Sequence, residues 1–230
     1  MFNIEERSYK ENIKLAGLFS FNAGYTNALA FLVFGISVSH VTGNVTKMGF
    51  SVSKLAEIAT RMGHKVQDLE LATQPLSLDL LILMTLVVVS FISGAFLGTV
   101  LMRKAGFCYA LILEGFFFFA ITAYSLEISA KYLNVRLIYP AILAVIMGCQ
   151  NAVTSYISSS VVRTTHLTGC STDIGMALGM KDYTQFVLMA TVFVGFLLGA
   201  VFGYQGYVHM GHKGFFIPGV FFTTIGLIFI

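Results

Sequence analysis

Long apolar runs separated by short polar stretches dominate the chain. Each run approaches the roughly 20 residues that a helix needs to cross the hydrocarbon core of a bilayer. The pattern predicts an all-α, polytopic membrane protein with six transmembrane helices, at residues 15–38, 78–102, 107–126, 137–158, 183–204 and 215–230. The sixth run has only 16 residues. We expect it to be tilted, to cross a thin bilayer, or to be cut short where the chain stops.

A different pattern fills residues 53–71, between the first two runs. Charged residues alternate there with apolar residues that recur every three or four positions, at Leu55, Ile58, Met62, Val66 and Leu69. This spacing predicts an amphipathic helix that is too polar to span and lies in the membrane interface. A docking site for a soluble partner is the alternative.

Composition and charge exclude the soluble classes. Charged residues make up 11% of the 230 positions and hydrophobic residues 57%, whereas soluble domains average about 25% charged. A net charge of +3 is also too small for a nucleic-acid surface. We therefore expect an integral, multi-pass membrane protein, with the lipid bilayer as partner and no nucleic acid. Basic residues divide too evenly between the two sides to fix the orientation, and a homo-oligomer stays open.

Cysteines and the N-terminus add little. Cys108, Cys149 and Cys170 show neither metal-ligand nor disulfide spacing, so we expect small packing residues, no metal and no cofactor. Acidic and basic residues mix before the first run, which argues against a cleaved signal peptide.

The two halves of the chain resemble each other. Residues 40–49 and 166–175 share five identities, at His40/His166, Thr42/Thr168, Gly43/Gly169, Thr46/Thr172 and Gly49/Gly175. Further matches follow the same order, namely Gly24-Tyr-Thr-Asn27-Ala with Gly148-Cys-Gln-Asn151-Ala, Gly94/Gly98 with Gly195/Gly199, and Gly106-Phe107 with Gly214-Phe215. Such self-similarity predicts an internal repeat, with residues 1–135 as repeat one and 136–230 as repeat two.

The predicted repeats have three spans each, and three is odd. The second repeat must then enter the membrane from the opposite side, which gives inverted-topology repeats related by a pseudo-two-fold axis. Sites in such folds lie near the midplane beside broken helices. We expect the glycines of the His-x-Thr-Gly motifs to make those breaks, and the glycine pairs to be packing positions.

The repeated residues also resemble a known family. Asn27-Ala-x-x-Phe-Leu and Thr42-Gly-Asn44, with Val162-Arg-Thr-Thr-x-Leu-Thr-Gly-x-x-Thr-Asp-Ile-Gly175, are similar to the YoaK family of small, mostly bacterial membrane proteins. The resemblance covers nearly the whole chain. It implies six spans and an integral location in a bacterial inner (cell) membrane, without assigning a biochemical role. Family members commonly have Asp at the position of Asn27 and a small hydroxyl or glycine-like residue at that of Cys170. The missing acid argues against proton coupling at position 27.

Polar residues of the spans and motifs form the candidate site. Such side chains usually face the bundle interior or a water-filled path. We expect a small solute to contact Asn27, His40, Thr42, Asn44, Gln150, Asn151, His166 and Thr168. Hydrogen bonding between helices, or from imidazole to backbone at a helix break, is the structural alternative. Glu114 could be a buried proton site, although a place near the interface is favoured, and Lys47 could pair with Asp173.

A transporter or channel for an unidentified small solute is the leading hypothesis. A non-transporting scaffold or regulator that binds through residues 53–71 is the alternative. An intramembrane enzyme using His40 or His166 with Glu114 or Asp173 is less favoured. No nucleophile motif, HExxH or phosphate loop is present, so we assign no catalytic residue and expect no enzyme.

Overall fold

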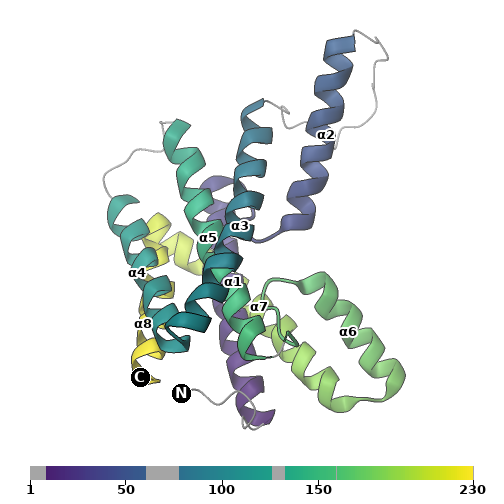
Figure 1. Ribbon diagram of the computed structural model, residues 1–230, viewed down its shortest axis with the longest axis vertical. Coiled ribbons are helices and arrows are strands. Elements are labelled where there is room, and N and C mark those ends of the chain that lie inside the picture. The colour runs from purple at the N-terminus through teal and green to yellow at the C-terminus, as the bar shows by residue number, and fades with distance from the viewer. Residues whose placement is uncertain (1–8, 61–77, 126–132, 159, 230) are drawn as a thin grey trace.

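Helices joined by turns and loops form the described structure, which confirms the all-α prediction. The computed structural model describes residues 9–60, 78–125, 133–158 and 160–229, and no strand occurs among them. In chain order the elements are α1 (Tyr9–Phe34), α2 (Val41–Thr60), α3 (Leu78–Lys104), α4 (Phe107–Ser125), α5 (Leu133–Ile157), α6 (Leu167–Met180), α7 (Tyr183–Met210), the 3-10 helix η3 (Gly211–Phe215) and α8 (Phe216–Ile228) (Figure 1).

Several of these helices could cross a membrane. Within the described residues, four stretches are long and apolar enough, namely Glu11–Phe34, Leu80–Lys104, Leu137–Ile157 and Tyr183–Ile228. The last stretch contains α7, η3 and α8, and α4 supplies a shorter apolar helix at Phe107–Ala123. The chain is therefore a multi-pass membrane protein.

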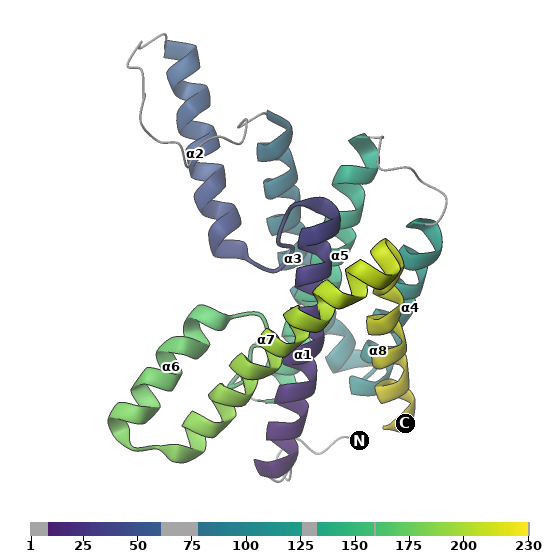
Figure 2. The same cartoon turned by 180° about the vertical axis from the view of Figure 1, so that it is seen from behind.

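The long helices pair between the two halves of the chain rather than within them. α1 packs along α7, α3 along α5, and α4 along α8. α1 and α7 cross near the middle of the molecule (Figure 2). The central core lies between these pairs and contains the fully buried side chains of Phe19, Leu111, Phe118, Leu143 and Phe222.

Glycines bring the backbones of α1 and α7 into contact. A Cβ added at Gly24 of α1 would meet the carbonyl oxygen of Phe196, and one added at Gly199 of α7 would meet that of Phe21. Small residues allow such close approach of membrane helices. The predicted packing role of the glycines is confirmed here.

The α3–α5 pair repeats this arrangement. A Cβ at Gly148 of α5 would meet the carbonyl oxygen of Phe91, and one at Gly94 of α3 would meet that of Val145. Gly148 and Gly24 thus occupy matching positions in their helix pairs, as do Gly94 and Gly199.

This match corrects the predicted alignment of the glycine pairs. Gly94 and Gly98 correspond to Gly199 and Gly203 by their contacts, and not to Gly195 and Gly199. A Cβ at Gly98 would lie 2.8 Å from the Cys149 carbonyl oxygen, and one at Gly203 would lie 2.5 Å from that of Tyr25. α7 carries three glycines at four-residue spacing, so the sequence permits two alignments and only the packing selects one.

The repeated His-x-Thr-Gly motif begins a helix in each half. His40 directly precedes α2, and His166 is the N-cap of α6. The imidazole rings lie against the motif glycines, because a Cβ at Gly43 or Gly169 would be 2.7 or 2.5 Å from the histidine Nδ1. The prediction that these glycines break the helices is wrong, since the breaks precede the motifs.

α2 and α6 stand outside the central bundle. Both begin at about mid-height on the same side, and they run toward opposite ends of the molecule (Figures 1 and 2). α2 packs on α3 and α6 on α7. The helix predicted at 53–71 is the later part of α2 as far as Thr60, and its remainder lies outside the described residues.

Candidate functional site

We give the name polar core to five of the buried polar side chains on the apolar helices. Each is at most 3% exposed. Three come from the middle of α1, one from the middle of α4 and one from the later part of α5, namely Ser20, Asn22, Thr26, Glu114 and Gln150.

Helix α5 joins this set to both of the other helices. The amide Nε2 of Gln150 donates a hydrogen bond to the carbonyl oxygen of Phe19 in α1, over 2.9 Å. The preceding residue, Cys149, presents its thiol to the carboxyl of Glu114 in α4. Two successive residues of α5 therefore contact α1 and α4 at one level of the bundle.

Most polar atoms of the polar core lack partners. Among the described residues, no hydrogen bond is made by the hydroxyls of Ser20 and Thr26, by Asn22 Nδ2 or by Gln150 Oε1, and the Glu114 oxygens have only the Cys149 thiol beside them. Other helix hydroxyls bond the carbonyl four residues earlier, at Thr85, Ser93, Thr99, Thr122 and Thr191. An unsatisfied buried group costs about 1–3 kcal/mol. The polar core therefore presents donors and acceptors that a ligand or water would satisfy.

The predicted site residues of the first motif serve the turn between α1 and α2. Asn27 Oδ1 accepts hydrogen bonds from the hydroxyls of Ser37 and Ser39, at 2.7 and 2.9 Å. Asn44 Nδ2 donates to the carbonyl oxygen of Ser37 over 3.0 Å. The structure thus brings Asn27 and Asn44 together around Ser37, where they hold the chain rather than line a path.

The second motif does not show these hydrogen bonds among the described residues. Asn151 Oδ1 is buried without a partner in the part of the chain that the structure describes. Cys170 occupies the place of Asn44 and donates its thiol to the Met189 carbonyl oxygen, over 3.1 Å. Burial, with the nearby Asp173 carboxylate, raises the pKa of the Cys170 thiol to about 11.

A polar cavity of about 210 Å³ lies at the start of α6. Its lining includes Arg163, His166, Cys170 and Asp173. No ion pair joins Asp173 to Lys47 among the described residues. Within the same residues, no three His, Cys, Asp or Glu side chains lie close enough to hold a metal ion.

The remaining predicted residues lie away from the polar core. His40, Thr42, His166 and Thr168 are exposed. The backbone carbonyl oxygens of Thr42 and Thr168 each accept a hydrogen bond from a threonine hydroxyl one turn later in the same helix. The donors are Thr46 and Thr172, respectively. Of the eight predicted residues, Gln150 alone belongs to the polar core, and Asn151 follows it in the chain.

Sequence reasoning missed Glu114 as a site residue. Protein encloses this side chain, which is 2% exposed, whereas its place near the membrane interface stays a prediction. Ser20, Asn22 and Thr26 were missed as well. The available signal was the density of polar residues in the first span, together with one acid beside the aromatic run that starts at Phe116.

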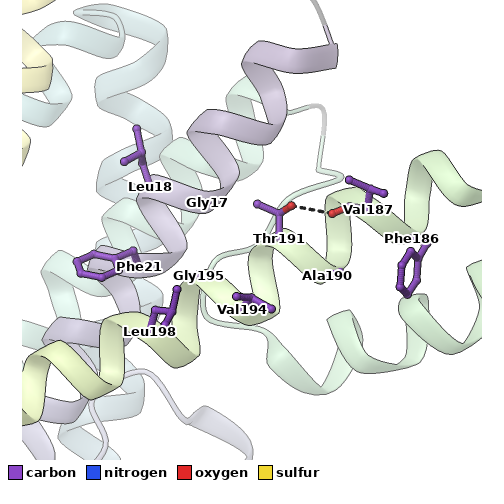
Figure 3. A pocket seen from close by; sticks show the side chains of 10 residues that line it. All are labelled: Gly17, Leu18, Phe21, Phe186, Val187, Ala190, Thr191, Val194, Gly195 and Leu198. Carbon is purple, nitrogen blue, oxygen red and sulfur yellow. Dashed lines mark hydrogen bonds between the residues drawn. The ribbon is translucent and has the colours of Figure 1, made fainter.

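A larger cavity of about 520 Å³ opens between α1 and α7 where they diverge from their crossing (Figure 3). Its lining is apolar apart from the hydroxyl of Thr191, which donates to the Val187 carbonyl oxygen over 2.8 Å. This groove suits hydrocarbon and offers little to a polar solute, so we do not place the site there.

Comparison with known proteins gives a family without an activity. The family model described as "Protein of unknown function (DUF1275)" matches residues 15–228, which include the whole polar core. No curated protein matches the chain, and no solved structure matches it.

Proposed function

The chain belongs to the DUF1275 family, and from that premise we propose that it is a transporter or channel that moves a small polar solute through the polar core. One observation carries the proposal, namely that three apolar helices bury polar atoms that, among the described residues, have no partner or, at Glu114, only the Cys149 thiol. Polar groups inside membrane spans are costly and mark solute or ion pathways. A merely structural cluster would satisfy its own hydrogen bonds.

The proposed architecture has six spans in two inverted repeats, 1–135 and 136–230. Division of the last apolar stretch at η3 and addition of α4 would give six spans. The matched glycine contacts of the α1–α7 and α3–α5 pairs support the repeat. The opposite directions of α2 and α6 support its inversion (Figure 1). In this arrangement Glu114 and Gln150 come from different repeats, so the polar core lies between them.

The chemistry of the polar core favours a neutral polar molecule or a cation. It offers hydroxyls, amides and one carboxyl, and no Lys, Arg or His is buried among the described residues. An anion would meet no positive charge there. The YoaK resemblance and a bacterial inner membrane belong to this proposal as its expected setting.

The central experiment measures solute entry into proteoliposomes. Stopped-flow light scattering with glycerol and urea as probes compares the wild type, the double variant Asn22→Leu/Gln150→Met, and empty liposomes. We expect wild-type permeation of at least one probe to exceed that of empty liposomes about tenfold, and the double variant to lose this excess. Thr154→Val is the matched control, because that buried hydroxyl already donates to the Gln150 carbonyl oxygen over 3.0 Å. Equal permeation by the wild type and the double variant would contradict the proposed path.

A second experiment tests the inverted repeats. Single cysteines replace exposed Ser53 on α2 and exposed Lys181 at the end of α6, in a background without the native cysteines. A membrane-impermeant maleimide added to intact cells should label only one of the two positions. The other position should be labelled only after the membrane is permeabilised. Labelling of both from the same side would refute the inverted architecture.

A scaffold or regulatory role through α2 is the second candidate. The observation that favours it is the exposure of Val45, Phe50 and Val52 on a helix that stands outside the bundle. Replacement of these three residues by serine should then release a bound partner in affinity purification while solute entry persists.

A further inference from the structure

We propose that Glu114 is a proton-binding site, which holds its proton while the polar core is closed and releases it when water enters. Coupling of that proton to solute movement rests on the proposed function, whereas the binding site itself does not.

The immediate surroundings of Glu114 are apolar. Leu111 and Phe118, about one turn away on α4, are fully buried. The Phe118 ring stacks on that of Phe222, with centroids 5.8 Å apart. A carboxylate in such a place is strongly disfavoured relative to the neutral acid unless a positive group stands beside it.

No such positive group reaches it from the packed elements that the structure describes. α5 contributes the Cys149 thiol, and α8 carries no titratable residue. The cations of α3, Arg103 and Lys104, are exposed at its end. His212 and Lys213 of η3 lie toward the other end of α4, before α8 begins.

The described elements around α4 therefore supply no counter-ion to Glu114. Among the described residues, Glu114 is also the one Asp, Glu, Lys, Arg or His side chain that is buried. We infer that the closed polar core contains Glu114 as the neutral carboxylic acid.

The second repeat shows that packing does not require an acid at this position. The match of Gly106-Phe107 with Gly214-Phe215 carries Glu114 onto Phe222, which is fully buried. The neighbouring matched pair, Gly115 and Thr223, is in direct contact across the α4–α8 interface. An apolar side chain thus fills the equivalent place in the second repeat. Packing alone therefore does not explain a carboxyl at position 114.

Release needs only water. When the polar core opens, the O–H bond of the acid breaks, the proton passes to an entering water and the electron pair stays on the carboxylate oxygen. Hydration then stabilises the anion and opposes closure until a proton returns. Protonation and the open or closed state of the polar core are therefore linked.

The first test detects the proton directly. Infrared difference spectra of the reconstituted protein, taken between acid and alkaline buffer, should contain a neutral carboxylic-acid carbonyl band that persists at pH 7. Glu114→Gln should remove this band and Glu114→Asp should shift it. Glu11→Gln, at an exposed acid of α1, should leave it unchanged. A pH 7 spectrum that is the same for wild type and Glu114→Gln would overturn the proposal.

The second test asks whether the proton controls opening. Cys149 is kept as the single cysteine by Cys108→Ser and Cys170→Ala, and its labelling by N-ethylmaleimide is followed from pH 6 to 9. The thiolate is the reactive form, so labelling alone rises at most about tenfold per pH unit. We expect a steeper rise with Glu114 present and at most tenfold in Glu114→Gln, with a Cys108-only protein as the control for pH. If the labelling rate rose equally with pH in the two proteins, the proton would not control opening, and the release step would be overturned.

The two tests need no solute. Glycerol and urea permeation that fails while both tests succeed would refute the proposed function and leave the proton site standing. Permeation that succeeds while the infrared band is absent would refute only the proton site. If Glu114→Gln does not fold, the band shift in Glu114→Asp decides the first test, and Glu114→Leu, which is apolar like the matched Phe222, replaces Glu114→Gln in the second.

Discussion

Alanine at Gly98 or Gly203 should separate the helix pairs that carry the fold. The added methyl carbon would lie 2.8 Å from the Cys149 carbonyl oxygen at Gly98 and 2.5 Å from the Tyr25 carbonyl oxygen at Gly203. Ordinary contact begins at 3.4 Å, so the backbones must move apart by 0.6 and 0.9 Å. Gaps of this size forfeit about a quarter to a half of the dispersion energy of each contact. Overpacking costs about 1–3 kcal/mol, and we expect about 2 kcal/mol, with the larger loss at Gly203.

A thiol-reactive dye measures this loss, because the chain has no Trp and Cys149 and Cys170 become accessible on unfolding. At about 2–4 °C per kcal/mol, Tm in detergent should fall by about 4–8 °C. Gly49→Ala and Gly175→Ala are the matched controls, since an added Cβ there meets nothing within 4 Å. A Tm for Gly203→Ala within about 1 °C of these controls would refute the close-packing argument.

Two further predictions concern the motifs. Asn27→Ala removes the acceptor of two hydroxyls and should lower stability by about 2 kcal/mol. Asn151→Ala, at an amide oxygen that has no partner among the described residues, should cost less than about 1 kcal/mol. Equal losses in thermal unfolding would contradict the different roles of the two residues. Asp173→Asn removes the negative charge that helps to raise the pKa of the Cys170 thiol to about 11, so the thiolate fraction and the maleimide labelling rate at pH 8 should rise, and an unchanged rate would show that access alone limits the reaction.

Local patterns were sufficient for the fold class and the positions of the long apolar helices, whereas α6 and the start of α2 were not predicted. Apolar run length predicts spans because the bilayer thickness sets it. Glycines four residues apart predict close packing because they share one helix face. Both properties belong to a single helix, and no knowledge of its neighbour is needed.

The site depends on neighbours, and here the sequence was insufficient. Whether Glu114 faces lipid, the interface or the interior depends on the rotation of α4 against α5 and α8, which no local pattern determines. Asn27 and Asn151 match in sequence yet differ in role, because Ser37 and Ser39 satisfy the first amide oxygen, whereas that of Asn151 has no partner among the described residues. A repeat in the sequence therefore did not imply a repeat in function.

The pairing of helices across the two halves also constrains how the protein is made. α3 and α5 are separated by one helix and can associate early, whereas α1 must wait for α7, after most of the chain has been synthesised. Until then, the face of α1 around Phe21 and Gly24, which contacts the α7 backbone, is without its partner helix. The α4–α8 pair forms later still, since α8 follows α7 in the chain, so two of the three helix pairs can close only when the last helices are in place.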